Sequence, residues 1–483
     1  MNIKNIAKKA SALTVAAALL AGGAPQTFAK ETQNYKKSYG FSHITRHDML
    51  KIPEQQKSEQ FKVPQFDPKT IKNIPSAKGY NKNGELIDLD VWDSWPLQNA
   101  DGTVATYHGY NLVFALAGDP KDVDDTSIYL FYQKKGETSI DSWKNAGRVF
   151  KDSDKFVPDD PYLKHQTQEW SGSATLTKDG KVRLFYTAFS GTQYGKQTLT
   201  TAQVNFSQPD SDTLKIDGVE DHKSVFDGAD GTVYQNVQQF IDEGNYSSGD
   251  NHTMRDPHYV EDRGHKYLVF EANTGTKTRL PRKKTPYSTE PTTGGSKKFF
   301  KEESSKLLQG ANKKNASLAN GALGIIELNN DYTLKKVMKP LTASNTVTDE
   351  IERANLFKMN GKWYLFTDSR GSKMTIDGIG SKDIYMLGYV SGSLTGPFKP
   401  LNKSGLVLHM DQDYNDITFT YSHFAVPQKK GDEVVITSYI TNRGISNEHH
   451  ATFAPSFLLK IKGSKTSVVK NSILEQGQLT VNK

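Results

Sequence analysis

Five short segments of the chain combine residue types that could act on a sugar. In each, carboxylates, arginine, aromatic or hydroxyl side chains stand where an otherwise apolar strand would begin. The segments are Trp92–Pro96, Glu169–Ser173, Arg255–Pro257, Asp349–Arg353 and Thr420–His423. Carboxylates supply acid and base, polar groups bind hydroxyls, and aromatic faces pack on sugar rings. If these segments meet, they predict a carbohydrate site, because they are too acidic for a phosphate site.

Cleavage of a glycosidic bond needs two carboxylic groups with separate roles. One attacks the anomeric carbon or activates water, and the other protonates the leaving oxygen. Crowded acids with arginine nearby keep one group ionised and another protonated near neutral pH. A single acid in a strand is more often a salt-bridge partner, but acids recur at one relative position in the first, third and fourth segments. The motifs of zinc proteases, serine hydrolases, P-loop proteins and dinucleotide-binding folds are absent from the sequence.

Each of these segments opens a repeated pattern that predicts the elements around it. A turn follows, then a very apolar strand that ends in glycine, then a third strand. The second strands are Leu112–Gly118, Val182–Gly191, Tyr267–Gly275, Trp363–Gly371 and Val434–Gly444. The third strands are Ile128–Tyr132, Leu199–Val204, Leu323–Leu328, Ile384–Val390 and Phe457–Ile461. Four of the second strands follow a tight glycine turn such as Asp179-Gly180 or Asn360-Gly361, which is typical of hairpins.

Five antiparallel units with irregular insertions predict an all-β fold, a five-bladed β-propeller with a central funnel. In such a fold the innermost strands all begin around one end of the central channel, so the five segments would converge. The alternative is a pair of β-sandwiches with coincidental repeats. We expect helical insertions at Gln235–Glu243 and Phe299–Gln309.

The composition and the N-terminal segment of the chain limit the possible classes of protein and indicate how the chain is divided. The chain has 483 residues, a formal net charge of +7 and no cysteine, which excludes disulfides and thiolate metal sites. No apolar run reaches the ~18 residues of a membrane-spanning helix. Residues 1–29 have the layout of a secretory signal peptide, with three early lysines, a short apolar stretch and an A-x-A-like end, and the alternative is a buried helix. Residues 30–483 then form a single catalytic propeller domain, in which residues 30–90 are an N-terminal wrap leading to a strand at Asp88–Trp92.

Two further segments have more than one interpretation. Residues 277–301 hold eight Lys and Arg against one acid, and five prolines and glycines predict an exposed loop there. A patch for an anionic polymer is the alternative. Asp411, Asp413 and Asn415 resemble the start of a calcium loop, but Asp416 stands where that loop needs glycine and Ser422 where it needs glutamate, so we reject it.

At this level of detail the chain resembles a known family. The strings VWDSWPLQNADGTVA, EWSGSATLT, RDPHYVED, TVTDEIERANLF, YLFTDSRGSKM and FTYSHFAVP are similar to those of Bacillus-type levansucrases in glycoside hydrolase family 68. The resemblance covers nearly the whole chain and implies a five-bladed β-propeller. It also implies a secreted fructosyltransferase that cleaves sucrose by a retaining double displacement.

The resemblance implies a role for particular residues. Asp93 would be the nucleophile, Glu352 the general acid/base and Asp256 the transition-state stabiliser. The positions that match substrate-binding residues are Trp92, Trp170, Ser171, Arg255, Glu350, Arg370 and Tyr421. The expected partners are sucrose, water and fructan acceptor chains, with no nucleic acid and no membrane after signal cleavage, and we expect a monomer.

The resemblance also implies a structural Ca²⁺ ion. The matching ligand positions are Asp250, the Leu318 carbonyl, Asn320 and Asp349. A glutamine ligand of the family is missing, because residues 276–284 contain none. Loss of one oxygen ligand beside added Lys and Arg should weaken Ca²⁺ binding. Ala188 is a second departure, at a position where relatives commonly carry aspartate.

The sequence leaves several functions open. An inulin-type transferase or a plain sucrose hydrolase could use the same scaffold, since linkage depends on how the acceptor sits. A non-catalytic carbohydrate-binding propeller would be expected to lack one of the three acids, yet all three are present. Polyanion binding through residues 277–301 would be a side activity that salt abolishes.

Overall fold

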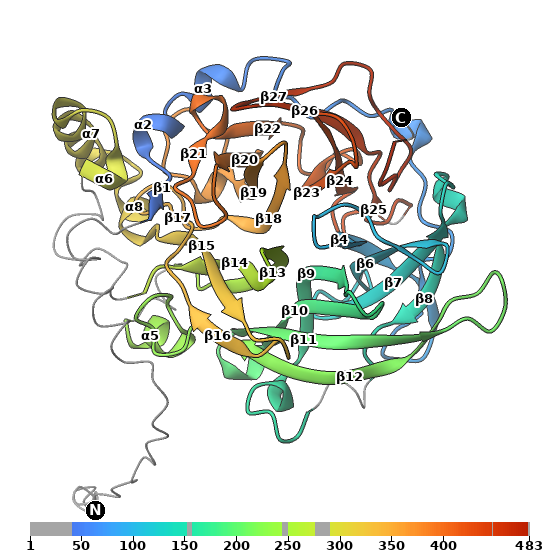
Figure 1. Ribbon diagram of the computed structural model, residues 1–483. Coiled ribbons are helices and arrows are strands. Elements are labelled where there is room, and N and C mark those ends of the chain that lie inside the picture. The colour runs from blue at the N-terminus through green and yellow to red at the C-terminus, as the bar shows by residue number, and fades with distance from the viewer. Residues whose placement is uncertain (1–40, 152–156, 244–249, 276–289, 447, 482–483) are drawn as a thin grey trace, which may run out of the picture. The chain divides into compact units, whose positions relative to one another are not determined.

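Apolar, β-branched and aromatic runs form five antiparallel sheets in the computed structural model, which describes residues 41–151, 157–243, 250–275, 290–446 and 448–481. The chain divides into two units, Met1–Tyr39 and Gly40–Lys483. The predicted signal peptide lies outside the described residues, and so does the start of the predicted wrap. All five blades belong to the second unit (Figure 1).

The strands follow the predicted order in every blade. Blade 1 contains β4 (Asp90–Gln98), β6 (Tyr110–Gly118), β7 (Ser127–Lys134) and β8 (Lys144–Arg148), with β5 (Thr106–Tyr107) on β6. Blade 2 contains β9 (Gln168–Leu176), β10 (Val182–Ser190), β11 (Lys196–Ser207) and β12 (Lys215–Phe226). Blade 3 contains β13 (Met254–Asp262), β14 (His265–Asn273), β15 (Gly321–Leu328), β16 (Leu334–Val337) and β17 (Thr342–Ala343).

The last two blades repeat the pattern. Blade 4 contains β18 (Glu352–Met359), β19 (Lys362–Arg370), β20 (Ile384–Ser391), β21 (Lys399–Pro400) and β22 (Leu406–Met410). Blade 5 contains β23 (Thr420–Pro427), β24 (Glu433–Ile440), β25 (Thr452–Phe453), β26 (Phe457–Lys462) and β27 (Lys465–Val468). The predicted five-bladed propeller is therefore confirmed.

The innermost strands form a closed ring. Neighbouring strands β4, β9, β13, β18 and β23 contact one another in turn, and β23 contacts β4. Between blades 1 and 2 the contact becomes a short parallel pairing, with Leu97 opposite Ala174. The ring explains why the five polar segments, far apart in the sequence, begin around one channel.

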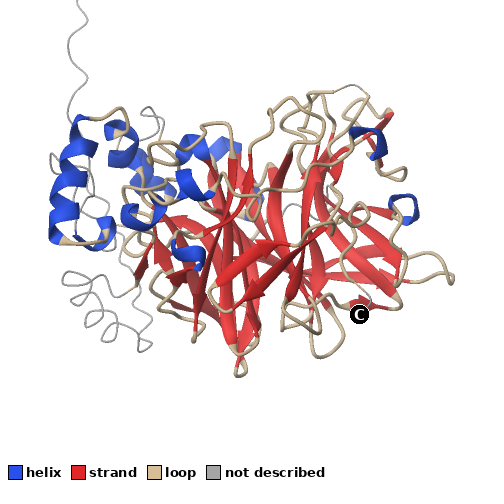
Figure 2. Ribbon diagram, turned by 90° about the horizontal axis from the view of Figure 1, so that it is seen from above, coloured by secondary structure: helices blue, strands red, loops and turns tan. Residues whose placement is uncertain are grey.

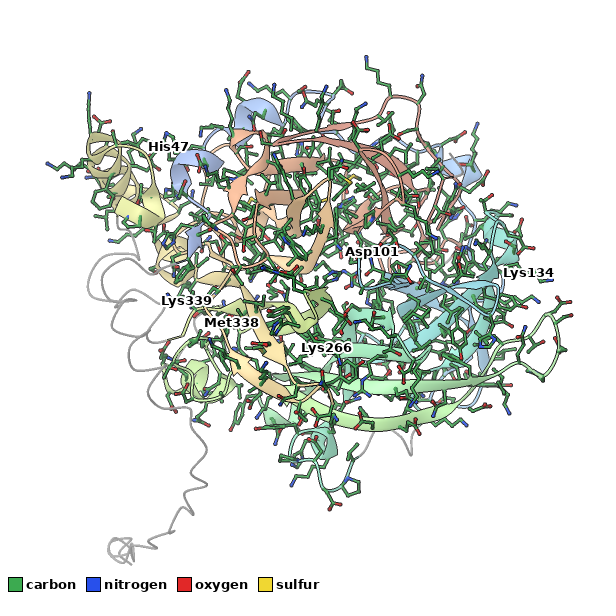
Figure 3. All side chains as sticks on the ribbon, viewed as in Figure 1. His47, Asp101, Lys134, Lys266, Met338 and Lys339 are labelled. Carbon is green, nitrogen blue, oxygen red and sulfur yellow. The ribbon has the colours of Figure 1, made fainter. Side chains whose placement is uncertain are left out.

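Apolar clusters fill the wedges between blades. Phe114 and Leu184 lie in a cluster shared by blades 1 and 2, and Ile325 and Leu356 lie in one shared by blades 3 and 4. Between blades 2 and 3, Phe185 stacks on Tyr259 with ring centroids 4.9 Å apart. Side chains thus fill the space between the sheets (Figure 3). Burial of this surface is the main stabilising term for a chain without disulfides.

The described part of the predicted wrap, residues 41–90, runs along the outer parts of several blades. β1 (Ser42–His43) pairs in parallel with β17, and Lys62 forms a parallel bridge with His409 of β22. The same stretch holds α2 (Arg46–Met49), α3 (Ile52–Gln55) and the hairpin of β2 (Lys78–Tyr80) and β3 (Leu86–Asp88). The strand expected at Asp88–Trp92 is β4.

Both predicted helical insertions are present, as α5 (Val237–Asp242) and α7 (Lys297–Gln309). The predicted loop at 277–301 is wrong at its end, since α6 (Glu290–Thr293) and the start of α7 replace it, and residues 276–289 lie outside the described part. Pro291 near the start of α6 and Ser296, which caps α7 by accepting from the Phe299 N–H, explain both helix starts.

Most helical residues gather on one flank of the strands (Figure 2). α8 (Lys313–Leu318) follows α7 there, and His47, labelled in Figure 3, packs edge-on against Phe299. Short 3₁₀ turns complete the described structure at Pro68–Thr70, Ile140–Ser142, Leu163–His165, Gly191–Gln193, Gly371–Lys373 and Leu401–Lys403. Within the described ranges no helix is long and apolar enough to cross a membrane.

A buried ion pair fixes α2 to this flank. Arg46 donates to Glu303 of α7 at 2.7 Å and to the Thr375 carbonyl at 2.7 Å, and the two charged side chains are only 2% and 7% exposed. Removing Arg46 leaves the glutamate buried and unpaired, which costs about 3–5 kcal/mol.

We therefore expect Arg46→Ala to lower Tm by about 3–5 °C, given ~1 kcal/mol per degree for a chain of this size. Differential scanning calorimetry measures the change. The control is Lys57→Ala, which breaks the fully solvated pair with Glu54 and should shift Tm by less than ~1 °C. Equal shifts in the two variants would show that the buried pair does not hold this flank.

Candidate active site

Each innermost strand is irregular at the point where its functional residues lie. The pairing register shifts between Val91 and Ser94 on β4, Arg255 and His258 on β13, Glu352 and Asn355 on β18, and Tyr421 and Phe424 on β23. On β9 the shift lies opposite Tyr186 and Thr187 of β10. A bulge re-aims side chains that a regular strand would direct elsewhere. The five bulges therefore build one site from five strands.

Three of these bulges contain a residue in the left-handed region. The φ angles are +57° at Asp256, +58° at Arg353 and +61° at Ser422. None is glycine, so each costs about 1–2 kcal/mol. Two of them support each other, because the Arg353 N–H donates to Asp256 Oδ2 at 2.9 Å, and the Asp256 N–H donates to Thr187 Oγ1 at 3.0 Å. The left-handed backbone and these two hydrogen bonds together fix the direction of the Asp256 carboxylate.

A cavity of about 270 Å³ opens at this end of the ring. All three predicted catalytic residues and four of the predicted binding residues line it. They are Trp92, Asp93, Trp170, Ser171, Arg255, Asp256 and Glu352. The structure thus brings together seven side chains that span 260 positions of the sequence.

The three remaining predicted binding residues adjoin the cavity through ion pairs and ring contacts. Arg255 Nη2 lies 3.2 Å from Glu350 Oε2. Arg370 Nε lies 3.5 Å from Glu350 Oε1 and 3.8 Å from Glu352 Oε2. The Arg370 guanidinium also lies over the Tyr421 ring, 4.3 Å from its centroid.

Arg255 is the common partner of the acids. Its Nε donates to Glu271 at 2.6 Å, and its Nη2 donates to Glu352 at 3.0 Å as well as to Glu350. The fork of the guanidinium suits such multiple carboxylate contacts. Glu271 is fully buried and also accepts from the Ile351 N–H at 3.0 Å, so it holds the arginine in place from below.

Burial raises the pKa of two of the predicted catalytic acids. Burial, with the neighbouring Glu350 charge added, raises the pKa of Glu352 well above its usual range, although Arg255 and Arg370 oppose the shift. Burial also raises the pKa of Asp256, against Arg255 and Arg353. Glu352 is therefore suited to carry a proton near neutral pH.

Asp93 has a different environment. Its Oδ2 accepts a short hydrogen bond of 2.5 Å from Ser171 Oγ. A hydroxyl donor at this distance orients the carboxylate. Asp93, oriented by Ser171, and Glu352, whose pKa is raised, supply the two carboxylic groups that glycosidic chemistry needs.

The aromatic walls are fixed by their own contacts. Trp170 stacks on Phe189 with centroids 4.2 Å apart, and its Nε1 donates to Gln168 at 2.8 Å. Arg443 lies over the Trp92 ring at 4.0 Å and donates to the Asp122 carbonyl at 2.7 Å. Rigid walls reduce the side-chain entropy that the site loses when a sugar binds.

Sequence reasoning missed several contributors. Arg443, Gln168, Val123, Thr126 and Leu116 also line the cavity, and Glu271 lies beneath it. A signal existed for two of them. Arg443-Gly444 ends the predicted second strand Val434–Gly444 as Arg370-Gly371 ends Trp363–Gly371, and Glu271 is a charged residue inside an apolar strand. The other four carry no such mark in the sequence.

The predicted metal ligands are oxygen donors grouped beside blades 3 and 4. The Asp349 carboxyl is buried and its Oδ1 lacks a hydrogen-bond partner, while burial and the nearby Asp250 raise its pKa well above the usual range. Asn320 Oδ1 accepts from Asn273 at 2.7 Å and keeps a second lone pair. Leu318 ends α8, two positions before Asn320. An all-oxygen set with two carboxylates fits Ca²⁺.

The two departures from the family pattern lie in different parts of the chain. The segment that lacks the glutamine lies within residues 276–289, outside the described part. Ala188 is a buried β10 residue in the apolar cluster between blades 1 and 2. Among the described residues no group of three or more His, Cys, Asp or Glu side chains is placed to hold a metal.

A five-bladed propeller with paired carboxylates, a shared arginine and aromatic walls in one axial cavity defines a carbohydrate-processing class of protein. The chain belongs to glycoside hydrolase family 68, the levansucrase/invertase family, whose model matches residues 34–480.

Three relatives illustrate the similarity. The chain is 74% identical to the levansucrase of Bacillus subtilis strain 168, over all of both chains. It is 72% identical, again over all of both, to a Geobacillus stearothermophilus protein named inactive levansucrase. A solved levansucrase variant complexed with sucrose has a TM-score of 0.88 and 75% identity, with 92% of this chain and 99% of that chain covered.

The raised pKa of Glu352 predicts a pH-dependent cost to stability. A carboxyl whose pKa is higher in the folded than in the unfolded state favours folding most at low pH. That contribution is lost as pH rises from the unfolded value, ~4.3, through the folded one. Glu352→Gln removes the group, so we expect the variant to be more stable than the parent at pH 7, by about 1–2 °C in Tm.

The advantage should vanish near pH 4, where both states of the parent are protonated. Scanning calorimetry of parent and variant at the two pH values measures it. Glu54→Gln, at an exposed glutamate of α3, is the control and should show no such difference. A lower Tm for Glu352→Gln at pH 7 would mean that the ion pairs with Arg255 and Arg370 outweigh the burial of the charge.

Proposed function

We propose that the protein is a fructosyltransferase that cleaves sucrose, releases glucose and transfers the fructosyl group to a growing β-2,6 fructan or to water. The observation that carries this proposal is the placement of Asp93, Asp256 and Glu352 in one cavity with Arg255 and Ser171. Membership of the levansucrase/invertase family and the similarity to a levansucrase complexed with sucrose support the substrate.

In the first step the Asp93 carboxylate attacks C2 of the fructosyl unit. The bond from C2 to the glucosyl oxygen breaks, and the Glu352 proton moves to that oxygen, so that glucose leaves neutral. Ser171 keeps the attacking carboxylate in position. Burial of Glu352 supports its role as the acid, because its raised pKa keeps the proton available.

In the second step Glu352, now ionised, takes the proton of an acceptor hydroxyl. The acceptor oxygen attacks C2, and the ester bond to Asp93 breaks. A water acceptor gives fructose, whereas a sugar acceptor lengthens a fructan. Asp256, held by its strained backbone, is placed to bind fructosyl hydroxyls in both steps, and Arg255 balances the charge that moves between the acids.

The decisive test is incubation of the purified protein with sucrose, with glucose, free fructose and polymer followed together. The parent should release more glucose than free fructose and form polymer. Asp93→Ala should lose at least ~10⁴-fold in kcat, because no covalent intermediate can form. Asp101→Ala, at an exposed turn aspartate labelled in Figure 3, is the control and should match the parent.

Other outcomes assign other functions. Equal amounts of glucose and fructose without polymer would make the protein a sucrose hydrolase. A β-2,1-linked polymer would make it an inulin-type transferase. A folded parent that leaves sucrose intact would contradict the proposal and favour a carbohydrate-binding propeller, a result that the inactive relative makes worth testing.

We also propose that Asp250, the Leu318 carbonyl, Asn320 and Asp349 hold a structural Ca²⁺ ion. The buried, unpartnered Asp349 Oδ1 and the mutual repulsion of Asp349 and Asp250 support a cation between them. The ion would offset this repulsion and fix the backbone that leads to Glu350 and Glu352, which follow Asp349 by one and three residues. It takes no part in the two steps above.

Chelation tests the calcium proposal through stability. A ligand at about 100 times its Kd stabilises by ~2.7 kcal/mol, so excess EGTA should lower Tm by about 2–4 °C, and added Ca²⁺ should restore it. Asp349→Ala should be insensitive to EGTA. If EGTA lowers Tm equally in the parent and in Asp349→Ala, calcium acts at another place in the chain and the proposed site is wrong.

Secretion is part of the same proposal. The first 29 residues have the basic, apolar and small-residue order of a signal peptide, and the chain contains no cysteine. A mature N-terminus at Lys30 in culture medium is the expected result.

A further inference from the structure

Two further cavities lie at the end of blades 4 and 5 that carries the acids. One of about 210 Å³ is lined by side chains that include Arg370, Lys382, Tyr414 and Phe419. Another of about 400 Å³ is lined by residues that include Asp416, Asn442, Ile445 and Glu448. Asn415 lines both, so the two cavities are neighbours.

The smaller of these cavities continues from the active site. Glu352 lines the catalytic cavity, and Arg370, which pairs with Glu352 and covers Tyr421, lines the next one. Three cavities therefore follow one another, from the acids through Arg370 to the loop around Asn415.

The loop between β22 and β23, residues 411–419, separates the two outer cavities. It is the segment that resembles a calcium loop but departs from it. Three hydrogen bonds attach it to the loop after β24. Thr441 Oγ1 donates to the Ile417 carbonyl at 2.7 Å, the Thr441 N–H donates to the Phe419 carbonyl at 3.2 Å, and Asn442 donates to the Tyr414 carbonyl. These hydrogen bonds fix the position of the loop relative to blade 5.

Tyr414 is the exposed ring on this surface. It is 43% exposed and packs against Phe419 with centroids 5.6 Å apart and an angle of 58° between the ring planes, so the ring is supported by a second aromatic side chain. Ile445, on the facing loop, is 41% exposed. A supported aromatic ring at the rim of a polar cavity is a binding surface for a sugar ring, whose C–H groups pack on it while its hydroxyls find amide and carboxylate partners.

The charges favour a neutral ligand. The two cavities are lined by two basic side chains, Arg370 and Lys382, and two acidic ones, Asp416 and Glu448. The remaining lining residues are Asn, Ser, Thr and apolar side chains. A polyanion or a cation would meet a charge of its own sign in one cavity or the other.

We propose that the two cavities bind the fructan acceptor chain, with Tyr414 as the stacking platform, as the chain leaves the active site past Arg370. This inference rests on the proposed function, because it assumes that the covalent fructosyl group passes to a sugar. Binding beyond Arg370 would keep a chain in place between transfers, so that the same chain is lengthened repeatedly. An acceptor held at this surface gains effective concentration at the acids.

Binding is measured without turnover. In an Asp93→Ala background, calorimetric titration with β-2,6-linked fructo-oligosaccharides should give an affinity that Tyr414→Ala lowers roughly five- to tenfold, the range of one aromatic stacking contact. Tyr414→Phe keeps the ring and should stay within about twofold of the parent. Ile445→Ala, across the larger cavity, is a second variant in case Tyr414→Ala folds poorly, and it should also weaken binding.

A second readout follows the products. The single variant Tyr414→Ala, with Asp93 intact, should make shorter polymers from sucrose than the parent does, because each fructan chain dissociates from the protein sooner. Unchanged oligosaccharide affinity in both Tyr414→Ala and Ile445→Ala would overturn the proposal. So would an equal weakening of sucrose binding, since Tyr414 would then act through the donor site. If the parent leaves sucrose intact, that result contradicts the proposed function. The binding titration is separate, because it is made without turnover in the Asp93→Ala background.

Discussion

One arginine holds three glutamates together, and the geometry of the active site depends on this contact. Arg255 donates to Glu271, Glu350 and Glu352 from a side chain that is itself almost buried. Without a shared cation, three carboxylates this close would repel one another in a poorly solvated space. With the Arg255 guanidinium present, Glu350 and Glu352 both lie at hydrogen-bond distance from the same nitrogen atom. Burial of the site then raises the pKa of Glu352.

The propeller supplies the rigidity that this arrangement requires. Asp93, Asp256 and Glu352 come from three different innermost strands, β4, β13 and β18, so only closure of the ring sets their separations. The bulges turn these side chains toward the channel, and left-handed residues such as Asp256 and Arg353 fix their direction. The strain of such residues, about 1–2 kcal/mol each, is small beside the burial of the four apolar clusters between the blades of the described structure. The apolar core between the blades therefore stabilises a site that is locally unfavourable.

Donor chemistry and acceptor binding use different parts of the same end of the molecule. The acids and the two tryptophans line a cavity of about 270 Å³, whereas the proposed acceptor surface consists of two neighbouring cavities of about 210 Å³ and about 400 Å³. Under the two proposals, the acids carry out the transfer of the fructosyl group, and the loops around Asn415 bind the chain that receives it.

The sequence by itself determined the blades and the identity of the reactive groups. Apolar runs ending in glycine, with hairpin turns such as Asn360-Gly361, mark local strand structure, so the strand order of all five blades and both helical insertions could be predicted. Asp93, Asp256 and Glu352 lie in segments long and specific enough to indicate the family. Tertiary structure alone decided how they meet. Glu271 gains its role from Arg255, 16 positions away on the neighbouring strand, and the Tyr414 backbone is held by Asn442, 28 positions away. The protonation of Glu352 likewise depends on burial and on neighbours from other strands, which no local pattern encodes, because charge interactions act through space and not along the chain.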